Sequence, residues 1–245
     1  MVDAVTMRDV QAAISEKVRQ MVANNILFKF LNDESLSATE RLRRIAPPFS
    51  YFVLAFHDLQ AHVLKYPDEE AETDHIKAAI NAHCAEDSTH WPMFVTDLKT
   101  LRVDKETSYT SAIKHLWGKR TRRQRYSCYD LAMLAHDSSD PILRFANILS
   151  FEITGHAFFG ECLELAERSE AETGKELLYF GRTHFLRETG GLHGQEDAEN
   201  ELLEMELSPE MRTKALEIAM KQLKIQDAQW GDIAMAAFAN EKCEL

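Results

Sequence analysis

Apolar residues recur every three or four positions along most of the chain, which is the spacing of one face of an α-helix. Pro47-Pro48 is expected to break the chain, and Pro92 to kink a long helix just after His90. Only 9 glycines and 6 prolines leave little punctuation for a fold of many strands, so the pattern predicts an all-α protein. The predicted helices span residues 5–31, 37–45, 49–64, 74–101, 109–117, 126–136, 141–168 and 175–190, and a last helix opens at Ser208-Pro209-Glu210.

Length and charge narrow the class of protein. A chain of 245 residues, 45% of them hydrophobic, can bury a full core, and we expect one domain over residues 1–245. The formal net charge of −12 argues against binding to nucleic acid or to an anionic membrane, so we expect a small-molecule partner. The N-terminus lacks a signal-peptide pattern, no run approaches the roughly 18 apolar residues of a membrane span, and the four cysteines form no CxxC pair. These features predict a cytoplasmic protein that is neither exported nor inserted into a membrane.

Three segments place histidines and carboxylates about one helical turn apart. A buried carboxylate or imidazole is costly unless it is paired, protonated or bound to a metal, so three such segments in one helical chain predict a shared interior metal site. Glu152 carries this argument best, because its neighbours in sequence are aromatic and aliphatic. The segments comprise His83, Glu86, Asp87 and His90; Glu152 and His156; and His184 and Glu188.

Each segment also has an ordinary structural interpretation, which for the first is that of core histidines with satisfied hydrogen bonds. His156 could simply pair with the carboxylate one turn before it, and His184 and Glu188 could belong to a network of charges on the surface. His193 and Asp197 form a rival pair at the same spacing. On a regular helix position 193 faces away from position 184, so both histidines could reach one site only if the helix breaks near residues 190–191.

The remaining motifs point away from common enzyme classes. No GxGxxG, GxxxxGK, GxSxG or HExxH pattern occurs, so nucleotide-binding, serine-hydrolase and zincin functions have no motif behind them. Residues 119–125 hold five cations in seven positions, which is typical of a solvated loop and would also suit a clamp for a phosphate or an acidic carrier protein. The solvated loop is the expectation for this segment.

In order along the chain, a carboxylate-histidine helix, a second helix with one glutamate and a third with His-x-x-x-acid resemble the haem-oxygenase-like superfamily. Within it, the similarity is to the dimetal oxidase and oxygenase branch and covers about residues 70–200. The resemblance implies a single-domain helical bundle that uses iron to activate dioxygen against a small amine, amino acid or fatty acid. Carboxylates mixed with imidazoles suit iron or manganese independently of the resemblance.

The resemblance also implies a set of metal ligands. Gly191 stands where that branch has one more histidine, so a second metal site would lack this ligand. The implied ligands are Glu86 and His90 from the first helix, Glu152 from the second, and His184 and Glu188 from the third, with His83 as a further candidate.

Two other functions stay open. The chain could be a metal-free helical binding or carrier-interaction protein that kept the fold and lost the chemistry through Gly191. It could also be a thiaminase II-like enzyme, which would need a catalytic cysteine, although none of the four cysteines lies in a motif of that kind. Assembly into a homodimer is left open as well.

Overall fold

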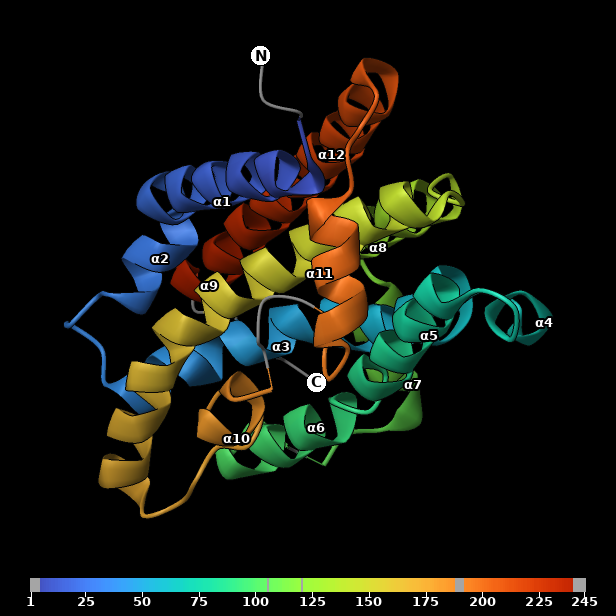
Figure 1. The fold of residues 1–245 in the computed structure, drawn as a ribbon. Helices are drawn as coiled ribbons and strands as arrows, with labels where there is room; N and C mark the ends of the chain where they lie inside the picture. Colours follow the sequence, from blue (N-terminus) through green and yellow to red (C-terminus); the bar gives the residue numbers. More distant parts are fainter. Residues whose placement is uncertain (1–4, 105, 120, 188–191, 240–245) are drawn as a thin grey trace.

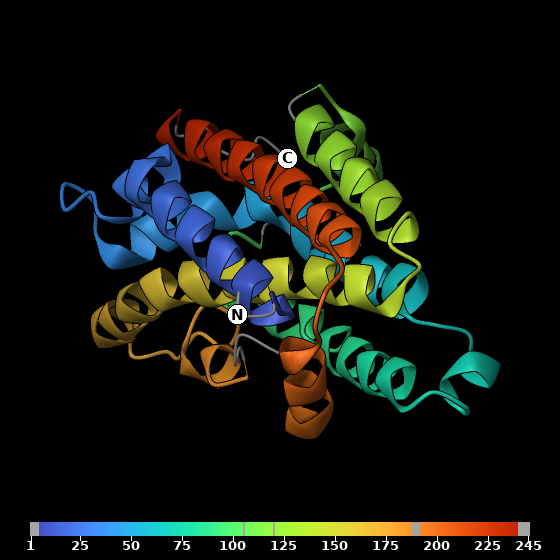
Figure 2. The same cartoon turned by 45° about the horizontal axis from the view of Figure 1, so that its top comes forward.

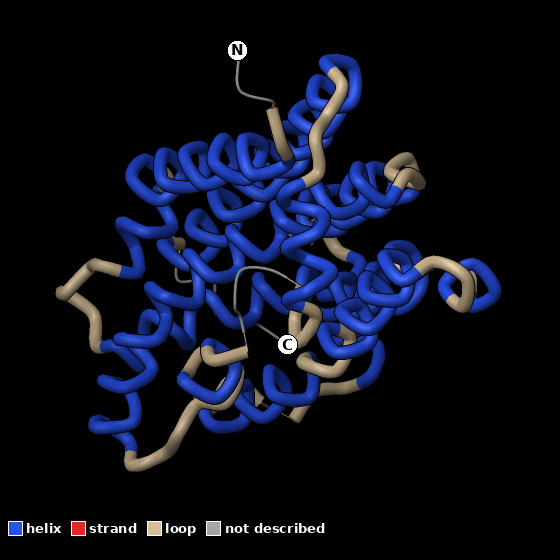
Figure 3. Tube along the Cα trace, viewed as in Figure 1, coloured by secondary structure: helices blue, strands red, loops and turns tan. Residues whose placement is uncertain are grey.

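The computed structural model describes residues 5–104, 106–119, 121–187 and 192–239. Regular structure in these ranges is helical, apart from one isolated bridge between Thr6 and Glu206 (Figures 1 and 3). The predicted all-α fold class is therefore confirmed. The elements are α1 (Met7–Asn24), α2 (Ile26–Leu31), α3 (Ala38–Asp58), the π-helix η1 (Leu59–Leu64), α4 (Asp68–Ala71), α5 (His75–Asp87), α6 (Trp91–Thr100), α7 (Tyr109–Trp117), α8 (Arg122–His136), α9 (Pro141–Thr173), α10 (Arg182–Phe185), α11 (Glu196–Glu204) and α12 (Pro209–Phe238).

The two longest helices, α9 and α12, pack against each other and organise the bundle. Helices α1, α2 and α3 contact both of them, and α8 packs on α12 and α3. Helices α5 and α10 contact α9, and in Figure 2 they lie with α11 on the side of α9 away from α12. The middle of α9 is therefore enclosed between the two groups of helices, where a polar side chain is removed from water.

The ends of α9 and the start of α12 follow local signals in the sequence. Asp140 accepts a hydrogen bond from the backbone N–H of Ile142 as the N-cap, and Pro141 occupies the first turn. Gly174 ends the helix in a left-handed conformation, with φ of 70°. Ser208 caps α12 through the N–H of Met211. The predicted start of each helix and the predicted break at Gly174 are confirmed.

The prediction that Pro47-Pro48 breaks the chain is wrong. Helix α3 runs without interruption from Ala38 to Asp58, with both prolines inside it. A proline in a helix interior costs about 3 kcal/mol, because it removes a hydrogen bond and crowds the preceding turn. Ile45, Ala46 and Phe49 on either side are buried in the core, and this packing offsets the cost. The helix then widens into η1, which carries Gln60 into the interior.

The predicted helix over residues 74–101 is two helices, α5 and α6, with a break at residues 88–90 in place of a kink. Pro92 lies in the first turn of α6, where a missing N–H has no cost. His90 is the N-cap residue of α6, directly before Trp91. The predicted helix over residues 5–31 divides in the same way at Asn25, whose side chain accepts a hydrogen bond from the N–H of Leu27.

The predicted helix over residues 175–190 is also wrong for most of its described length, since only Arg182–Phe185 is helical. Asp97 of α6 accepts hydrogen bonds from the backbone N–H groups of residues 178, 179 and 180 at 2.7, 2.9 and 3.0 Å. This buried carboxylate from another helix satisfies the N–H groups that a helix would use, so the segment is held in an irregular path.

The basic segment differs from the predicted solvated loop. Residues from Arg122 onward form the first turn of α8, and Arg125 is buried. Its guanidinium donates hydrogen bonds to the carbonyl oxygens of Leu116, Trp117 and Gly118 at 2.8, 3.2 and 3.2 Å. Arg125 thus satisfies the carbonyl groups at the end of α7 that have no partner within the helix, which explains why a cation is buried there.

None of the described helices combines the length and the apolar composition that a membrane crossing requires.

Candidate metal centre

Four elements bring carboxylates and imidazoles together at the middle of α9. Helix α5 contributes three of these residues from its last turns, and the break between α5 and α6 contributes one. Helix α9 contributes one more, and the segment from α10 to α11 contributes two. In relative exposure, His83 is at 0%, Glu152 at 2%, Asp87 at 3% and His184 at 2%, so these four are withdrawn from solvent, whereas the side chain of Glu86 is 35% exposed. Its members are His83, Glu86, Asp87, His90, Glu152, His184 and His193.

Four of these residues, His83, Asp87, Glu152 and His193, can hold a metal ion. Each offers one ligand atom, and all four atoms lie within 4.8 Å of one another. Two ligands of one ion, each about 2.0 to 2.2 Å from it, are at most about 4.4 Å apart, so a contraction of a few tenths of an ångström would close the group around an ion. Two imidazoles and two carboxylates form a mixed donor set.

His193 bridges two carboxylates. Its Nε2 donates to Oε2 of Glu152 at 2.9 Å and its Nδ1 donates to Oε2 of Glu86 at 2.8 Å. Burial opposes the charged imidazolium, but these hydrogen bonds outweigh burial and raise the pKa of His193 to about 11. Without a metal, His193 is therefore the cation that holds the two carboxylates together.

His83 has the opposite character. Burial lowers its pKa to about 4 despite the nearby Glu152 carboxylate, so the ring is neutral at pH 7. Its Nδ1 accepts a hydrogen bond of 3.3 Å from the backbone N–H of His193. Its Nε2 lies 3.4 Å from Asp87 and 3.6 Å from Glu152 and makes no hydrogen bond among the described residues. With Nδ1 as an acceptor the neutral ring carries its proton on Nε2, so this nitrogen could bind a metal ion only in the other tautomer.

A second group that could hold a cation comprises Glu86, Asp87 and His90, and it shares Asp87 with the first. Burial opposes ionisation of Glu86, but hydrogen bonds from His193 and His90 hold its pKa well below the usual range. His90 donates through Nε2 to Oε1 of Glu86 at 2.9 Å. Because Asp87 belongs to both groups, one carboxylate could serve two ions.

His184 contacts His90 through the ring nitrogen of His90 that does not bond Glu86. Its Nε2 is 3.0 Å from Nδ1 of His90, and because His90 donates to Glu86, the remaining nitrogen accepts a hydrogen bond from His184. The ring of His184 stacks on Tyr179 and meets the edge of Phe159, with both pairs of centroids 4.4 Å apart. Burial, followed by the neighbouring His90, lowers its pKa well below 6.5. His184 therefore orients His90 and belongs to neither of the two groups of candidate ligands.

Neighbouring polar groups hold the candidate ligands in place. Gln60, fully buried on the π-helix, donates through Nε2 to Oδ2 of Asp87 at 2.6 Å. Glu199 of α11 accepts a hydrogen bond from the N–H of Leu192 at 3.1 Å, which ties down the turn that carries His193. Such supporting contacts set the direction of a ligand and its basicity.

The structure places the sequence candidates as follows. His83, Glu86, His90, Glu152 and His184 come together, whereas Glu188 and Gly191 lie outside the described residues. His156 is exposed and its ring stacks on Phe185, and Asp197 is exposed on α11. The ligand set implied by the resemblance did not include Asp87 or His193. Asp87 already stood in the first carboxylate-histidine segment, and His193 reaches the site because the helix ends early, at Phe185.

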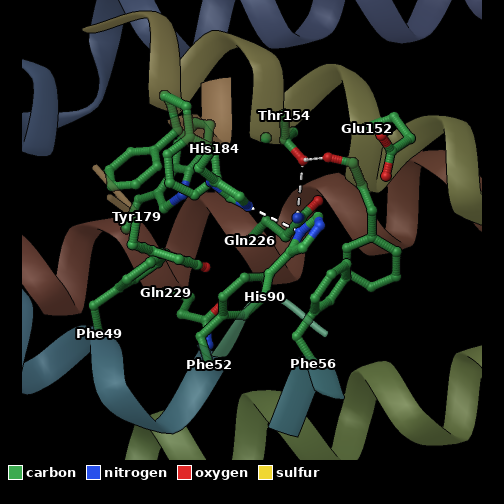
Figure 4. Close-up of a pocket in the computed structure, with 15 residues that line it drawn as sticks. Phe49, Phe52, Phe56, His90, Glu152, Thr154, Tyr179, His184, Gln226 and Gln229 are labelled. Carbon is green, nitrogen blue, oxygen red and sulfur yellow. Dashed lines mark hydrogen bonds between the residues drawn. The ribbon is translucent and has the colours of Figure 1, made fainter. Parts of the chain in front are cut away.

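A narrow cavity adjoins the centre on the side of α3 and α12 (Figure 4). Most of its wall is aromatic, and His90, Glu152 and His184 form its polar end. Its volume of about 40 Å³ is room for one or a few molecules the size of water. A larger ligand would have to displace aromatic side chains.

The cysteines do not support a thiaminase II-like mechanism. Cys84, Cys128 and Cys162 are buried, and burial raises the pKa of each thiol, to about 12 for Cys128. A nucleophilic cysteine needs a thiolate near neutral pH, which these surroundings oppose. Cys243 lies outside the described residues.

No protein-family model matches the chain, and no curated protein matches it either.

Proposed function

We propose that this protein is a non-haem iron-dependent oxidase or oxygenase that acts on a small metabolite, with an ion held by His83, Asp87, Glu152 and His193. The observation that carries the proposal is this buried group, whose ligand atoms lie within 4.8 Å of one another beside a cavity. Carboxylates and imidazoles are the donors that iron and manganese accept readily. The earlier resemblance to the dimetal branch of the haem-oxygenase-like superfamily points to iron and dioxygen.

Each residue has a defined part in this proposal. Iron would supply the redox chemistry towards dioxygen that side chains lack. His193 would give up one proton on ligating, and the carboxylate that this proton bonds, Glu86 or Glu152, would accept one hydrogen bond fewer. His83 would hold the ion through Nε2 in the tautomer that is protonated on Nδ1, and the 3.3 Å contact from the His193 N–H would then have to give way. Gln60 keeps Asp87 directed at the ion.

The test is anaerobic titration with ferrous iron, followed by exposure to dioxygen. We expect one tightly bound equivalent, a second weaker one at Glu86, Asp87 and His90, and consumption of dioxygen. Glu152→Ala should abolish the reaction and the tight equivalent. Glu164→Gln, an exposed position on the same helix, is the matched control and should leave both unchanged.

One observation favours a second candidate, the metal-free binding protein. His193 forms hydrogen bonds with two carboxylates, so its imidazolium could serve as the cation of the cluster in place of a metal. Elemental analysis and the same titration separate the two functions. Wild-type protein that takes up neither iron nor manganese, with or without a small-molecule ligand, would leave the binding protein as the function.

A further inference from the structure

The cavity beside the centre has three kinds of wall. Three ionisable side chains, those of His90, Glu152 and His184, line it (Figure 4). Thr154 of α9 and two glutamines of α12, Gln226 and Gln229, add neutral polar groups. The rest is aromatic apart from Gly155: Phe49, Phe52, Phe56, Phe151, Phe158, Phe159, Tyr179 and Trp230.

Gln226 has an acceptor without a partner. The residue is only 4% exposed, and its Nε2 donates to Oγ1 of Thr154 at 2.9 Å. The hydroxyl of Thr154 in turn donates to the carbonyl oxygen of Ser150 at 2.6 Å, one turn back on α9. The only proton of this hydroxyl is used in that bond, so towards Gln226 the hydroxyl can only accept. The group of Gln226 that faces Thr154 must therefore be the NH₂, and Oε1 faces away from Thr154. That oxygen makes no hydrogen bond among the described residues.

An unsatisfied buried acceptor is expensive and is commonly satisfied by water or a ligand. The matching ligand group is a donor, an O–H or an N–H. No lysine or arginine is among the residues that line the cavity, and Glu152 is. In the protein without a bound ion, a carboxylate or phosphate in this cavity would therefore be buried without a counter-charge and next to an acid, which is strongly unfavourable.

From these contacts we propose that the cavity binds an apolar molecule that carries a hydrogen-bond donor, an alcohol or an amine, and no negative charge. The donor meets Oε1 of Gln226, and the apolar part lies among the phenylalanine rings, which turn aside to admit it. The inference rests on the proposed function and changes its substrate class: amines remain, alcohols are added, and fatty acids and phosphorylated metabolites are disfavoured as long as no ion supplies a counter-charge.

Binding is tested with metal-free protein and three ligands of equal length: 1-hexanol, hexylamine and hexanoate. Affinities come from ligand-observed saturation-transfer NMR titrations. At pH 7 we expect hexanol or hexylamine to bind at least about tenfold more tightly than hexanoate, because only they donate to the orphan oxygen without adding a negative charge. Whichever of hexanol and hexylamine binds more tightly shows whether the site prefers a neutral or a cationic hydrogen-bond donor on the ligand. Hexanoate binding as tightly as either, or no binding by any ligand, overturns the proposal.

Two variants of α12 locate the effect. Gln226→Met removes the acceptor at similar side-chain length and should reduce the preference over hexanoate to within about threefold. Gln222→Met is the control, because Gln222 is a fully buried amide that does not line the cavity, and the wild-type preference should persist. An unchanged preference in Gln226→Met overturns the assignment of Gln226. Since no metal is present, failure of the iron titration and failure of this selectivity are separate results.

Discussion

Metal binding at this centre should displace a proton from His193. In the metal-free protein, hydrogen bonds to Glu152 and Glu86 outweigh burial and raise the pKa of His193 from 6.5 to about 11. This difference corresponds to about 6 kcal/mol in favour of the imidazolium, which the ion has to replace. His83, with its pKa lowered to about 4 by burial, is already neutral. We therefore expect release of about one proton per ion at pH 7, and an apparent affinity that rises about tenfold per pH unit between about pH 6.5 and 9.

The assay is calorimetric titration with manganese, which needs no anaerobic handling, in two buffers of different ionisation enthalpy at each pH. The difference between the two observed enthalpies gives the number of protons released. His193→Gln should bind more weakly, release almost no proton and lose the dependence on pH. His156→Gln, which changes an exposed histidine of α9, should behave as the wild type. Wild-type binding without proton release would refute the reasoning, because His193 would then remain a protonated partner of the carboxylates and not a ligand.

Three further outcomes follow from the structure. The lowered pKa values of His83 and His184 mean that the unfolded protein binds protons more readily than the folded protein below pH 6.5. Urea denaturation of metal-free protein should therefore show a lower free energy of unfolding as pH falls from 6.5 towards 4, by about 3 kcal/mol for His83 alone. Asp97→Ala should cost about 2 to 4 kcal/mol of unfolding free energy and weaken metal binding, because three backbone N–H groups lose their acceptor beside His184. Arg125→Met should cost about 1 to 3 kcal/mol with metal content unchanged, whereas the exposed Arg122→Gln should change stability by less than about 0.5 kcal/mol.

The fold could be predicted from the sequence wherever local chemistry decides it. The Asp140-Pro141 start of α9, the glycine at its end and the Ser208-Pro209 start of α12 act within one turn of the chain, and each lies where expected. Pro47 and Pro48 are the counterexample. Their local preference is real, but the packing of neighbouring residues in the core outweighs it, and the sequence of the segment does not reveal those contacts.

Of the candidate site, too, only the parts that depend on local sequence could be predicted. Histidines and acids on one stripe of α5 could be recognised from their spacing, and the aromatic neighbours of Glu152 already indicated a buried carboxylate. The inward position of His193 depends on contacts over long distances in sequence. Asp97 of α6 prevents a regular helix after α9, and Glu199 of α11 holds the turn at Leu192. Helical periodicity assumes a continuous helix and cannot register either contact.

His193 is the residue that links the two possible states of the cluster. Counted formally, Glu86, Asp87 and Glu152 bring three negative charges, of which the imidazolium of His193 balances one, and Arg187 lies 3.7 Å from Glu86. Exchange of the His193 proton for one divalent ion raises the formal charge of the cluster by one, and a second ion on the shared carboxylate of Asp87 would raise it by two more. Buried charges are tolerated when they are paired, so the cluster without an ion is the less balanced state, with the imidazolium of His193 inside it and the half-exposed Arg187 beside Glu86 as its cations. The hydrogen bonds that stabilise the imidazolium also set a threshold, because a bound ion has to displace the proton of His193. A monovalent cation, which oxygen ligands bind weakly, cannot do so, and the cluster is therefore selective against it.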